Sequence, residues 1–451
     1  MAFWVIITAI AVSYGWGMRG TLLGHGRGAM LPGALLGLCI AFMSGIPALE
    51  NNWIVLAGAG AAAMYYGGGM TYGETIGLVL HNKPSAPHFN GVIGLVIKGI
   101  MWFGVAGGYL AIAIRALGGQ VYSLAELVIL AAMPIVLWPL GVKIFNRPHK
   151  PEEGKLPKLY FSHERAESWG GHLLTLLAII IYSAVKGDSF TLIMALFGAL
   201  GGGLGWFVGI YFYYLSHSPF KNGKWLFGRL SAGGYIDGWK IMECVLGFFG
   251  GGFIALGFAV AKSDLGFILL AAPSRLEGVL ATLLPVLWLL AAAAVVIKAR
   301  LQKKMGKVLT YLMQTVFATA ALALIYAGSE LTAALTLGTL LMGILIDKMC
   351  FEKFNRETPF PGAWMITAVS LILMAVVTVV TFVNHSIPLW CFLAIVLGMY
   401  ELFTLAHHFH PGKWALVKEN GAGKVFRSAF TVNGYFILTI IIFLICFYSV
   451  I

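Results

Sequence analysis

Apolar runs long enough to cross a bilayer, which takes about 20 residues, recur from one end of this chain to the other. Of its 451 residues, 59% are apolar and only 11% are charged, whereas soluble domains carry about 25% charged residues. A transmembrane β-barrel would instead show alternating segments of about ten residues, and the sequence lacks that pattern. The sequence therefore predicts an all-α polytopic membrane protein.

The hydropathy pattern predicts about fourteen transmembrane helices. The first apolar run has no basic region before it and no clear cleavage site, so we interpret it as a retained span. The predicted spans are 2–15, 30–46, 54–80, 91–115, 126–143, 168–185, 190–216, 232–261, 277–297, 308–327, 332–349, 362–384, 389–406 and 429–450. The long runs at 54–80 and 232–261 leave room for a tilt, a break or a re-entrant piece.

Basic residues alternate from loop to loop and indicate the orientation. If the N-terminus lies outside the cytoplasm, the loops on one side hold nearly all lysines and arginines, and the opposite loops hold only Arg115, Lys186, Lys262 and Arg275. Cytoplasmic loops of membrane proteins carry such an excess. We therefore predict a multi-pass protein of the cytoplasmic (inner) membrane with both termini outside. The net charge of +12 is explained by these loops and not by a nucleic-acid partner.

The sequence also contains an internal echo. The triplets His25-x-Arg27 and His163-x-Arg165 each precede an apolar helix with a glycine and a Leu-Leu pair at the same spacing. An even number of predicted spans separates the triplets, so both would lie on one membrane face, as in parallel repeats. Chance similarity between helices rich in glycine and leucine is the alternative. The predicted parts are a first transmembrane repeat at 1–150, a second repeat at 151–304 and a C-terminal transmembrane bundle at 305–451.

The stretch from residue 15 to residue 28 places Arg19, His25 and Arg27 among six glycines, just after one apolar run and just before another. Glycine exposes backbone N–H groups, and N–H groups beside arginines at the start of a helix can bind an anion. Anchoring of helix ends at the cytoplasmic face is the structural alternative.

Several ionisable residues lie within the predicted spans, where they are costly and usually face a cavity or a partner. Asp237, Lys240 and Glu243 are three residues apart and so lie along one helix face. We expect Lys98 and Lys240 to bind substrate, and Glu74, Asp237 and Glu243 to couple an ion or relay protons. A purely structural ion pair between Glu74 and Lys98 is the alternative.

Tryptophans occur mainly near predicted membrane edges, where aromatic residues typically form interfacial belts. Trp16 and Trp239 also neighbour charged residues and could stack on a planar face of a substrate. The tryptophans interpreted as belt residues are Trp16, Trp169, Trp206, Trp239, Trp390 and Trp414.

The cluster His407-His408-x-His410 resembles a metal site by composition alone. Adjacent histidines on a regular helix do not readily face one ion, so we expect a solvated loop and predict neither a metal nor a cofactor. The five scattered cysteines are expected to be small buried hydrophobic residues.

These patterns favour a secondary transporter for a small organic anion of the carboxylate, phosphate or acidic sugar type. One alternative is a membrane-embedded transferase or hydrolase for a phosphate-bearing or lipid-linked substrate, with His25 or His163 as general base; another is a structural subunit. Expected partners are the lipid bilayer and a small anionic substrate, without nucleic acid, and a homo-oligomer is compatible with the sequence. The predicted substrate-binding residues are Trp16, Arg19, His25, Arg27, Lys98, His163, Arg165, Trp239 and Lys240.

Overall fold

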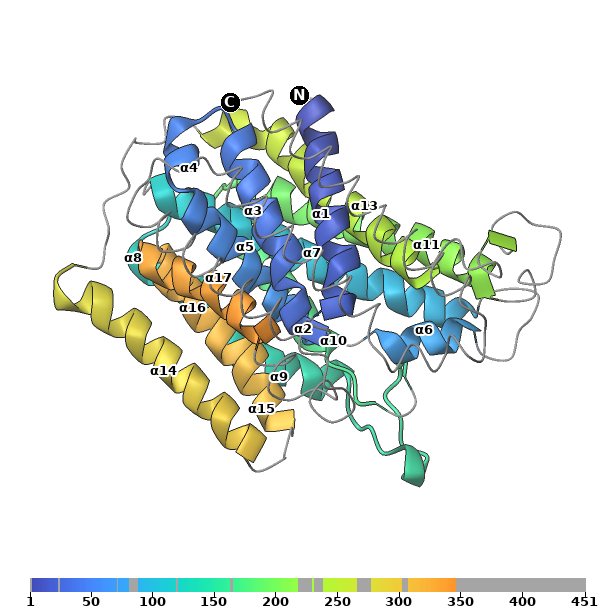
Figure 1. The fold of residues 1–451 in the computed structure, drawn as a ribbon. Coiled ribbons are helices and arrows are strands. Elements are labelled where there is room, and N and C mark those ends of the chain that lie inside the picture. Colours follow the sequence, from blue (N-terminus) through green and yellow to red (C-terminus); the bar gives the residue numbers. More distant parts are fainter. Residues whose placement is uncertain are drawn as a thin grey trace, which may run out of the picture. The chain divides into compact units, whose positions relative to one another are not determined.

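The computed structural model describes residues 2–22, 25–70, 72–80, 88–118, 121–162, 165–217, 229–230, 238–265, 277–301 and 307–345. These residues are almost entirely helical and include no β-strand (Figure 1). The chain forms two compact units. The first comprises Met1–Arg19, His25–Tyr211 and Met242–Leu340, and the second comprises Gly20–Gly24, Phe212–Ile241 and Leu341–Ile451.

Four helical segments among the described residues are long and apolar enough to cross a membrane. They are α7 (Phe89–Gly118), the pair α8 (Leu124–Ala132) and α9 (Pro134–Phe145), α11 (Ser189–His217), and α13 (Gly238–Ala261) with the short helix η3 (Lys262–Leu265). The structure describes further helices besides these four segments. These are α1 (Ala2–Leu22), α2 (His25–Gly28), α3 (Met30–Met43), α4 (Pro47–Asn51), α5 (Trp53–Gly67), α6 (Gly73–Leu80), η1 (Pro151–Glu153), α10 (Trp169–Val185), α14 (Val279–Leu301), α15 (Lys307–Tyr311), η4 (Leu312–Phe317), α16 (Ala318–Tyr326) and α17 (Glu330–Leu345).

Most described helices coincide with the predicted apolar runs, although α2 and α4 lie in predicted connections and η4 interrupts the run 308–327. Three further differences concern individual runs. The run 54–80 is broken after Gly67 into α5 and α6. The run 126–143 is divided at Pro134, because proline has no N–H for the helical ladder. The first helix continues past the predicted end to Leu22, so Arg19 lies within a helix and not in a loop. The predicted spans 362–384, 389–406 and 429–450 lie outside the described residues, and the three-part division of the chain stays a prediction.

Helix α7 lies at the centre of the first unit, and most of its residues are buried (Figure 1). It packs against α5, α6 and α10. Its crossing with α11 has no room for side chains: a methyl group at Gly99 would lie 2.2 Å from the carbonyl oxygen of Gly202. The crossing of α3 with α5 is equally close, because a methyl group at Gly33 would lie 2.2 Å from the carbonyl oxygen of Gly60. Small residues allow such contact between helices in lipid, where packing drives association.

The packing of α13 against α1 also depends on glycine. A methyl group at Gly247 would lie 2.6 Å from the carbonyl oxygen of Val12 and 2.7 Å from Cβ of Trp16. Glu243 stands one helical turn before Gly247 on the same helix. The close approach therefore brings the buried carboxyl group of Glu243 to the part of α1 that carries Trp16.

Apolar side chains point outward from several helices. On α11, Leu196, Leu200 and Leu204 are 48%, 56% and 41% exposed, and their spacing of four residues places them on one face. A soluble protein rarely shows a large contiguous apolar surface. Together with the four segments that are long and apolar enough to cross a membrane, these exposed leucines suggest a helical membrane protein.

Polar contacts join three connecting segments at the C-terminal end of α7. Arg115, in the last turn of α7, forms an ion pair with Asp188 and donates from Nη1 to the carbonyl oxygen of Asp264 at 3.1 Å. Asp188 also accepts from Tyr122 at 2.8 Å, and burial raises the pKa of this tyrosine. Tyr122 follows α7, Asp188 lies between α10 and α11, and Asp264 follows α13. These three connecting segments therefore lie together at the end of α7.

We predict that replacing Gly202 by alanine will destabilise the protein, because the new methyl group meets the backbone of α7 and not a flexible side chain. Overpacking of this kind typically costs about 1–3 kcal/mol. The matched control is Gly338→Ala on α17, where a methyl group meets nothing within 4 Å. Thermal unfolding in detergent measures both. Equal unfolding temperatures for the two variants would show that the α7–α11 crossing does not limit stability.

Candidate functional site

Arg19 is buried near the end of α1 and is only 3% exposed. Its guanidinium carbon lies 4.9 Å from the ring centre of Trp16, 5.0 Å from that of Tyr72 and 5.2 Å from that of Trp102. Trp16 and Arg19 are three residues apart and share one face of α1. Three aromatic rings therefore surround one positive charge in the interior, an arrangement that is favourable in a desolvated setting.

Tyr72 connects this charge to a carboxylate. Nη2 of Arg19 donates to the hydroxyl oxygen of Tyr72 at 2.8 Å, and this hydroxyl donates to Oε1 of Glu243 at 3.1 Å. The ring of Tyr72 also contacts the indole of Trp206, with 4.9 Å between ring centres. We call this group the Arg19 cage, and its members are Trp16, Arg19, Tyr72, Trp102, Trp206 and Glu243.

The break between α5 and α6 positions Tyr72 and Trp102. A methyl group at Gly67 would lie 2.1 Å from Cδ1 of Trp102, so only glycine admits the indole there. The indole Nε1 of Trp102 then donates to the carbonyl oxygen of Met64 at 3.0 Å. After the break, the carbonyl of Tyr72 accepts from the N–H of Ile76 at 2.9 Å and so begins α6.

Four donor nitrogens of the cage are buried and have no hydrogen-bond partner among the residues that the structure describes. They are Nε and Nη1 of Arg19, Nε1 of Trp16 and Nε1 of Trp206. A buried donor left unsatisfied costs about 1–3 kcal/mol, and more when it is charged. An excess of unpaired N–H groups around a guanidinium suits a ligand that brings acceptor oxygens.

A second polar group lies next to the cage. Phe161, Ser162 and the segment 165–168 form what we call the strap, which precedes α10. Glu167 of the strap reaches Lys98 of α7, with Oε1 and Nζ 2.6 Å apart and both side chains only 2% exposed. Nζ of Lys98 also donates to the hydroxyl of Thr75 at 2.7 Å, and Oε2 of Glu167 accepts from the N–H of Phe161 at 3.0 Å.

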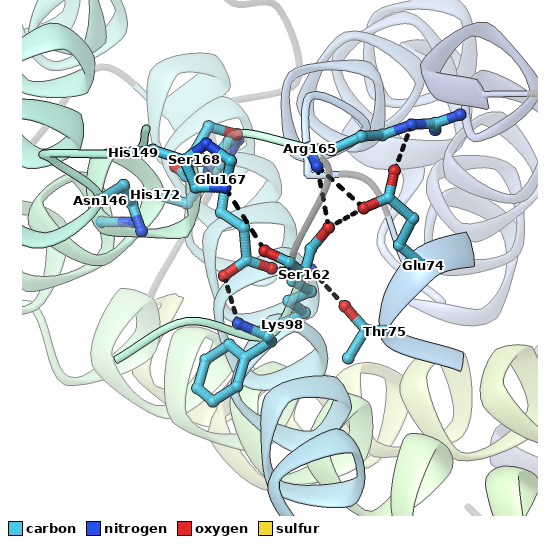
Figure 2. A network of polar contacts seen from close by, with 12 residues as sticks. Glu74, Thr75, Lys98, Asn146, His149, Ser162, Arg165, Glu167, Ser168 and His172 are labelled. Atoms are coloured by element: carbon cyan, nitrogen blue, oxygen red, sulfur yellow. Dashed lines mark hydrogen bonds and ion pairs between the residues drawn. The ribbon is translucent and has the colours of Figure 1, made fainter. Parts of the chain in front are cut away.

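The strap makes another ion pair nearer to solvent. Nε of Arg165 lies 2.6 Å from Oε1 of Glu74, and these side chains are 56% and 24% exposed. Oε2 of Glu74 accepts from the N–H of Arg165 at 3.0 Å and from the hydroxyl of Ser162. Figure 2 shows Glu74 and Thr75 on one side of the strap and Lys98 below it. The strap is thus fastened to α6 and α7 by an exposed and a buried ion pair.

These pairings differ from the structural alternative suggested by the sequence. Lys98 pairs with Glu167, and Glu74 pairs with Arg165, so the expected tie between Glu74 and Lys98 is replaced by two ties to the strap. The reason is that Glu74 and Thr75 are adjacent in the first turn of α6. Thr75 is the one that faces α7, and Glu74 faces the strap (Figure 2).

The strap and the cage share their supporting helices. Tyr72 of the cage and Glu74 of the strap contact are two residues apart at the start of α6. Lys98 and Trp102 are four residues apart and lie on one face of α7. Ser168 further joins the strap to the end of α5 by donating to the carbonyl oxygen of Gly69 at 3.1 Å. Movement of the strap would therefore act directly on the helices that hold the cage.

Glycines in the stretch from residue 15 to residue 28 have a packing role. A methyl group at Gly26 would lie 2.5 Å from the side chain of Gln314 and 3.3 Å from the backbone of Gly68, and one at Gly28 would lie 2.8 Å from the carbonyl oxygen of Arg19. The side chains of His25 and Arg27 lie outside what the structure describes, as do His163 and Asp237.

Trp239 and Lys240 belong to the second unit. There, Trp239 packs edge-to-face against Tyr213, with 5.5 Å between ring centres. Of the predicted site residues that the structure describes, Trp16, Arg19 and Glu243 lie together in the cage. Glu74, Lys98 and Arg165 lie together at the strap.

The expectation that Trp16, Trp169 and Trp206 form an interfacial belt is wrong. Trp16 and Trp206 are fully buried and Trp169 is 3% exposed. Their indoles fill space between helices, whereas belt residues face the lipid headgroups. Proximity to a predicted membrane edge does not reveal whether a tryptophan points outward or inward.

Sequence reasoning missed four residues of the site. Tyr72 and Trp102 are aromatic residues within apolar runs, and the sequence offers nothing to separate them from ordinary core residues; Trp206 was interpreted only as a belt residue. Glu167 offered a signal, because it is an acidic residue in a strongly basic connection directly before a span. Such a carboxylate is expected to pair with a lysine or arginine nearby.

Comparison with protein-family models, curated proteins and solved structures finds no match to this chain. Within the described part of the chain, no three or more His, Cys, Asp or Glu side chains are arranged to hold a metal ion. The cluster His407-His408-His410 lies outside that part. The Arg19 cage and the strap are therefore the candidate functional site of the described part of the chain.

We predict that Lys98→Met will destabilise the protein strongly, because the buried carboxylate of Glu167 loses the ammonium group 2.6 Å away. Removing one partner of a buried pair typically costs about 3–5 kcal/mol, whereas replacing both by apolar residues costs much less. The double variant Lys98→Met, Glu167→Met should therefore unfold at a higher temperature than Lys98→Met alone.

The matched control is Lys150→Met, which removes an exposed pair with Glu153 in the same connection. Exposed pairs contribute little, so we expect no measurable shift in unfolding temperature in detergent. A double variant less stable than Lys98→Met would contradict the buried pair as the source of the loss.

Proposed function

We propose that this protein is a secondary transporter that carries a small organic anion across the membrane, with the Arg19 cage as the binding site. The anion would be of the carboxylate, phosphate or acidic sugar type. The observation that supports this proposal most is the set of unpaired N–H groups of Arg19, Trp16 and Trp206 in the interior. A ligand with acceptor oxygens would satisfy them, and it would be held by charge-assisted hydrogen bonds, which are stronger than neutral ones.

Burial of this arginine also supports a role in binding. A charged residue within a span is costly, and such residues usually mark a pathway for a substrate or an ion. Arg115 provides a contrast within the same protein, because its Nε, Nη1 and Nη2 all contact acceptors of Asp188 or Asp264. Arg115 is therefore accounted for as a structural tie, whereas Arg19 keeps unused donors.

In this proposal the strap closes the cage on its own side of the membrane. The exposed Arg165–Glu74 pair would break first, and the buried Lys98–Glu167 pair would break when the strap lifts from α7. The strap lies in the basic connection that the charge pattern assigns to the cytoplasm. Lifting would open the cage to the cytoplasmic side, and reclosing would return it to the closed arrangement.

The proposal includes the finer architecture predicted from sequence. Fourteen spans, two parallel repeats and a C-terminal bundle would place the protein in the cytoplasmic (inner) membrane with both termini outside. The ends of α7 are compatible with this orientation: the strap lies near its start, and the weakly basic connections containing Arg115 and Lys262 lie at its end. Parallel repeats would be a suitable frame for a cavity between the halves.

We predict that Arg19→Gln will weaken anion binding by about ten- to hundredfold, because charge-assisted hydrogen bonds contribute about 1.5–3 kcal/mol. Arg19→Lys should give an intermediate loss, since it keeps the charge but not the planar guanidinium. The measurement is uptake of radiolabelled succinate, gluconate, glucuronate and glycerol 3-phosphate into proteoliposomes, with concentration dependence for each anion that is transported.

The control variant is Arg115→Lys, which alters a partly buried arginine whose three guanidinium nitrogens all contact acceptors. It should lower thermal stability and leave the concentration dependence of uptake within about twofold of wild type. Absence of uptake across the panel by well-folded protein would count against transport. Turnover of a phosphate-bearing substrate in detergent would favour the membrane-embedded enzyme instead.

A further inference from the structure

The outer face of α9 changes from apolar to basic along its length. Of the four segments that are long and apolar enough to cross a membrane, the one that contains α9 is the least buried. Val136, Leu140 and Ile144 follow one another at four-residue spacing on α9 and are 66%, 44% and 56% exposed. Because this spacing places them on one face of the helix, they form a continuous apolar surface, which we call the α9 stripe.

Two basic residues stand where the α9 stripe ends. Lys143 is exposed in the last turn of α9, and Arg147 follows the residue that caps the helix. Nη1 of Arg147 donates to the carbonyl oxygen of Asn146 at 3.3 Å, so its guanidinium stays at the helix end. We call Lys143 and Arg147 the basic pair.

The basic pair has no acidic partner among the described residues, since none of the ion pairs there includes either residue. Other basic residues nearby differ in this respect. Lys150 and Lys155, in the connection that follows, both contact Glu153. An apolar surface that ends in uncompensated positive charge is complementary to an apolar chain that ends in a negative group.

The start of α10 adds hydrogen-bond donors beside the basic pair. Helices α9 and α10 are in backbone contact, because a methyl group at Gly141 would lie 2.2 Å from the carbonyl oxygen of Gly170. Oδ1 of Asn146 accepts from the N–H of Gly170 at 2.8 Å, which fixes this amide at the first turn of α10. Figure 2 shows Asn146 on the side of the strap away from Glu74.

Two of the donors at this junction are unused. Nδ2 of Asn146 and Nε1 of Trp169, the first residue of α10, are buried and have no acceptor among the described residues. The Trp169 ring stays between the helices, with 5.7 Å between its centre and that of Phe145. The positive end of the dipole of a 17-residue helix lies at the same place. Unused N–H groups and a helix start favour a group with acceptor oxygens and negative charge.

We propose that the junction of α9 and α10 binds an anionic phospholipid. The acyl chain lies along the α9 stripe, and the phosphate contacts the basic pair. A phosphate oxygen that enters the junction accepts from Nδ2 of Asn146 and Nε1 of Trp169. The α9 stripe covers about 12 Å at 1.5 Å per residue, which is close to the ~15 Å of half the hydrocarbon core.

The position of the junction favours a lipid as the occupant. The charge pattern of the loops predicts that this end of α9 lies at the cytoplasmic edge, where anionic lipids attract basic residues. At the opposite end of the same segment, Lys186 pairs with Glu126 and so carries no uncompensated charge. A zwitterionic lipid brings its own cation next to the phosphate and gains less from the basic pair. This inference does not depend on the transport proposal.

The test measures lipid binding to the full-length protein in detergent by native mass spectrometry. The probes are phosphatidylglycerol and phosphatidylcholine with identical acyl chains, and wild-type protein should bind the former at least about tenfold more tightly. The double variant Lys143→Gln, Arg147→Gln should lower affinity for phosphatidylglycerol by about 25-fold, because each basic residue near an anionic lipid contributes about fivefold. Its affinity for phosphatidylcholine should stay within about twofold of wild type.

The matched control is Lys150→Gln, Lys155→Gln, which removes the same charge from residues that already contact Glu153. It should bind phosphatidylglycerol within about twofold of wild type. Trp169→Phe keeps the ring beside Phe145 and removes only Nε1, so it should lower this affinity by about three- to tenfold. This variant changes no charge and decides the matter if the basic-pair variant does not fold.

Four results would overturn the inference. Equal affinity of wild-type protein for the two lipids would show general contact with the bilayer, and equal losses in the two double variants would show a response to net charge. Unchanged affinity in Trp169→Phe would exclude a headgroup at the start of α10. Displacement of the lipid by an equal concentration of the deacylated headgroup, glycerophosphoglycerol, would show a site for a free phosphate in which the α9 stripe has no part.

Discussion

Close backbone contact at glycines is the constraint on which the rest of this structure depends. Helix α7 crosses α11 where Gly99 and Gly202 meet, and a methyl group at either position would lie about 2 Å from the opposing carbonyl oxygen. Because lipid tails are as apolar as leucine, helices in a bilayer gain from tight packing more than from burial of apolar surface. The glycine crossings therefore determine which helices can be neighbours. The positions of the polar side chains result from that arrangement.

The same crossings place the charged groups. Gly247 lets α13 approach α1, which brings Glu243 to the level of Trp16 and Arg19. Gly67 leaves room for the indole of Trp102 at the end of α5. After the interruption between α5 and α6, the Tyr72 hydroxyl contacts Arg19. A larger residue at these points would displace the helices, and the hydrogen bonds that link Arg19 to Glu243 through Tyr72 depend on their positions. The site is thus a consequence of helix packing.

The buried and partly buried charges fall into two kinds. Lys98 with Glu167, and Arg115 with Asp188, are ion pairs whose members contact each other directly, which offsets part of the cost of removing charge from water. Arg19 is different, because aromatic rings and a tyrosine hydroxyl surround it, while Nε and Nη1 have no acceptor among the described residues. In this protein, a candidate binding group is a buried charge whose desolvation is only partly offset by hydrogen bonds and ion pairs. A charge with a direct ionic partner is a structural tie.

The sequence by itself indicated a helical protein with apolar segments long enough to cross a membrane, and most described helices coincide with its apolar runs, because such runs are a local property of the chain. It also indicated Glu74, Lys98 and Glu243 as ionisable residues within apolar runs, and Arg19 as a basic residue in a glycine-rich stretch. Only the tertiary structure decided their partners. Tyr72, Trp102 and Trp206 join the site, and Lys98 pairs with Glu167 and not with Glu74, through contacts between residues 53 to 171 positions apart in the chain. Such contacts depend on which helix faces meet, and in this chain that is set by backbone approach at scattered glycines, which no local pattern encodes.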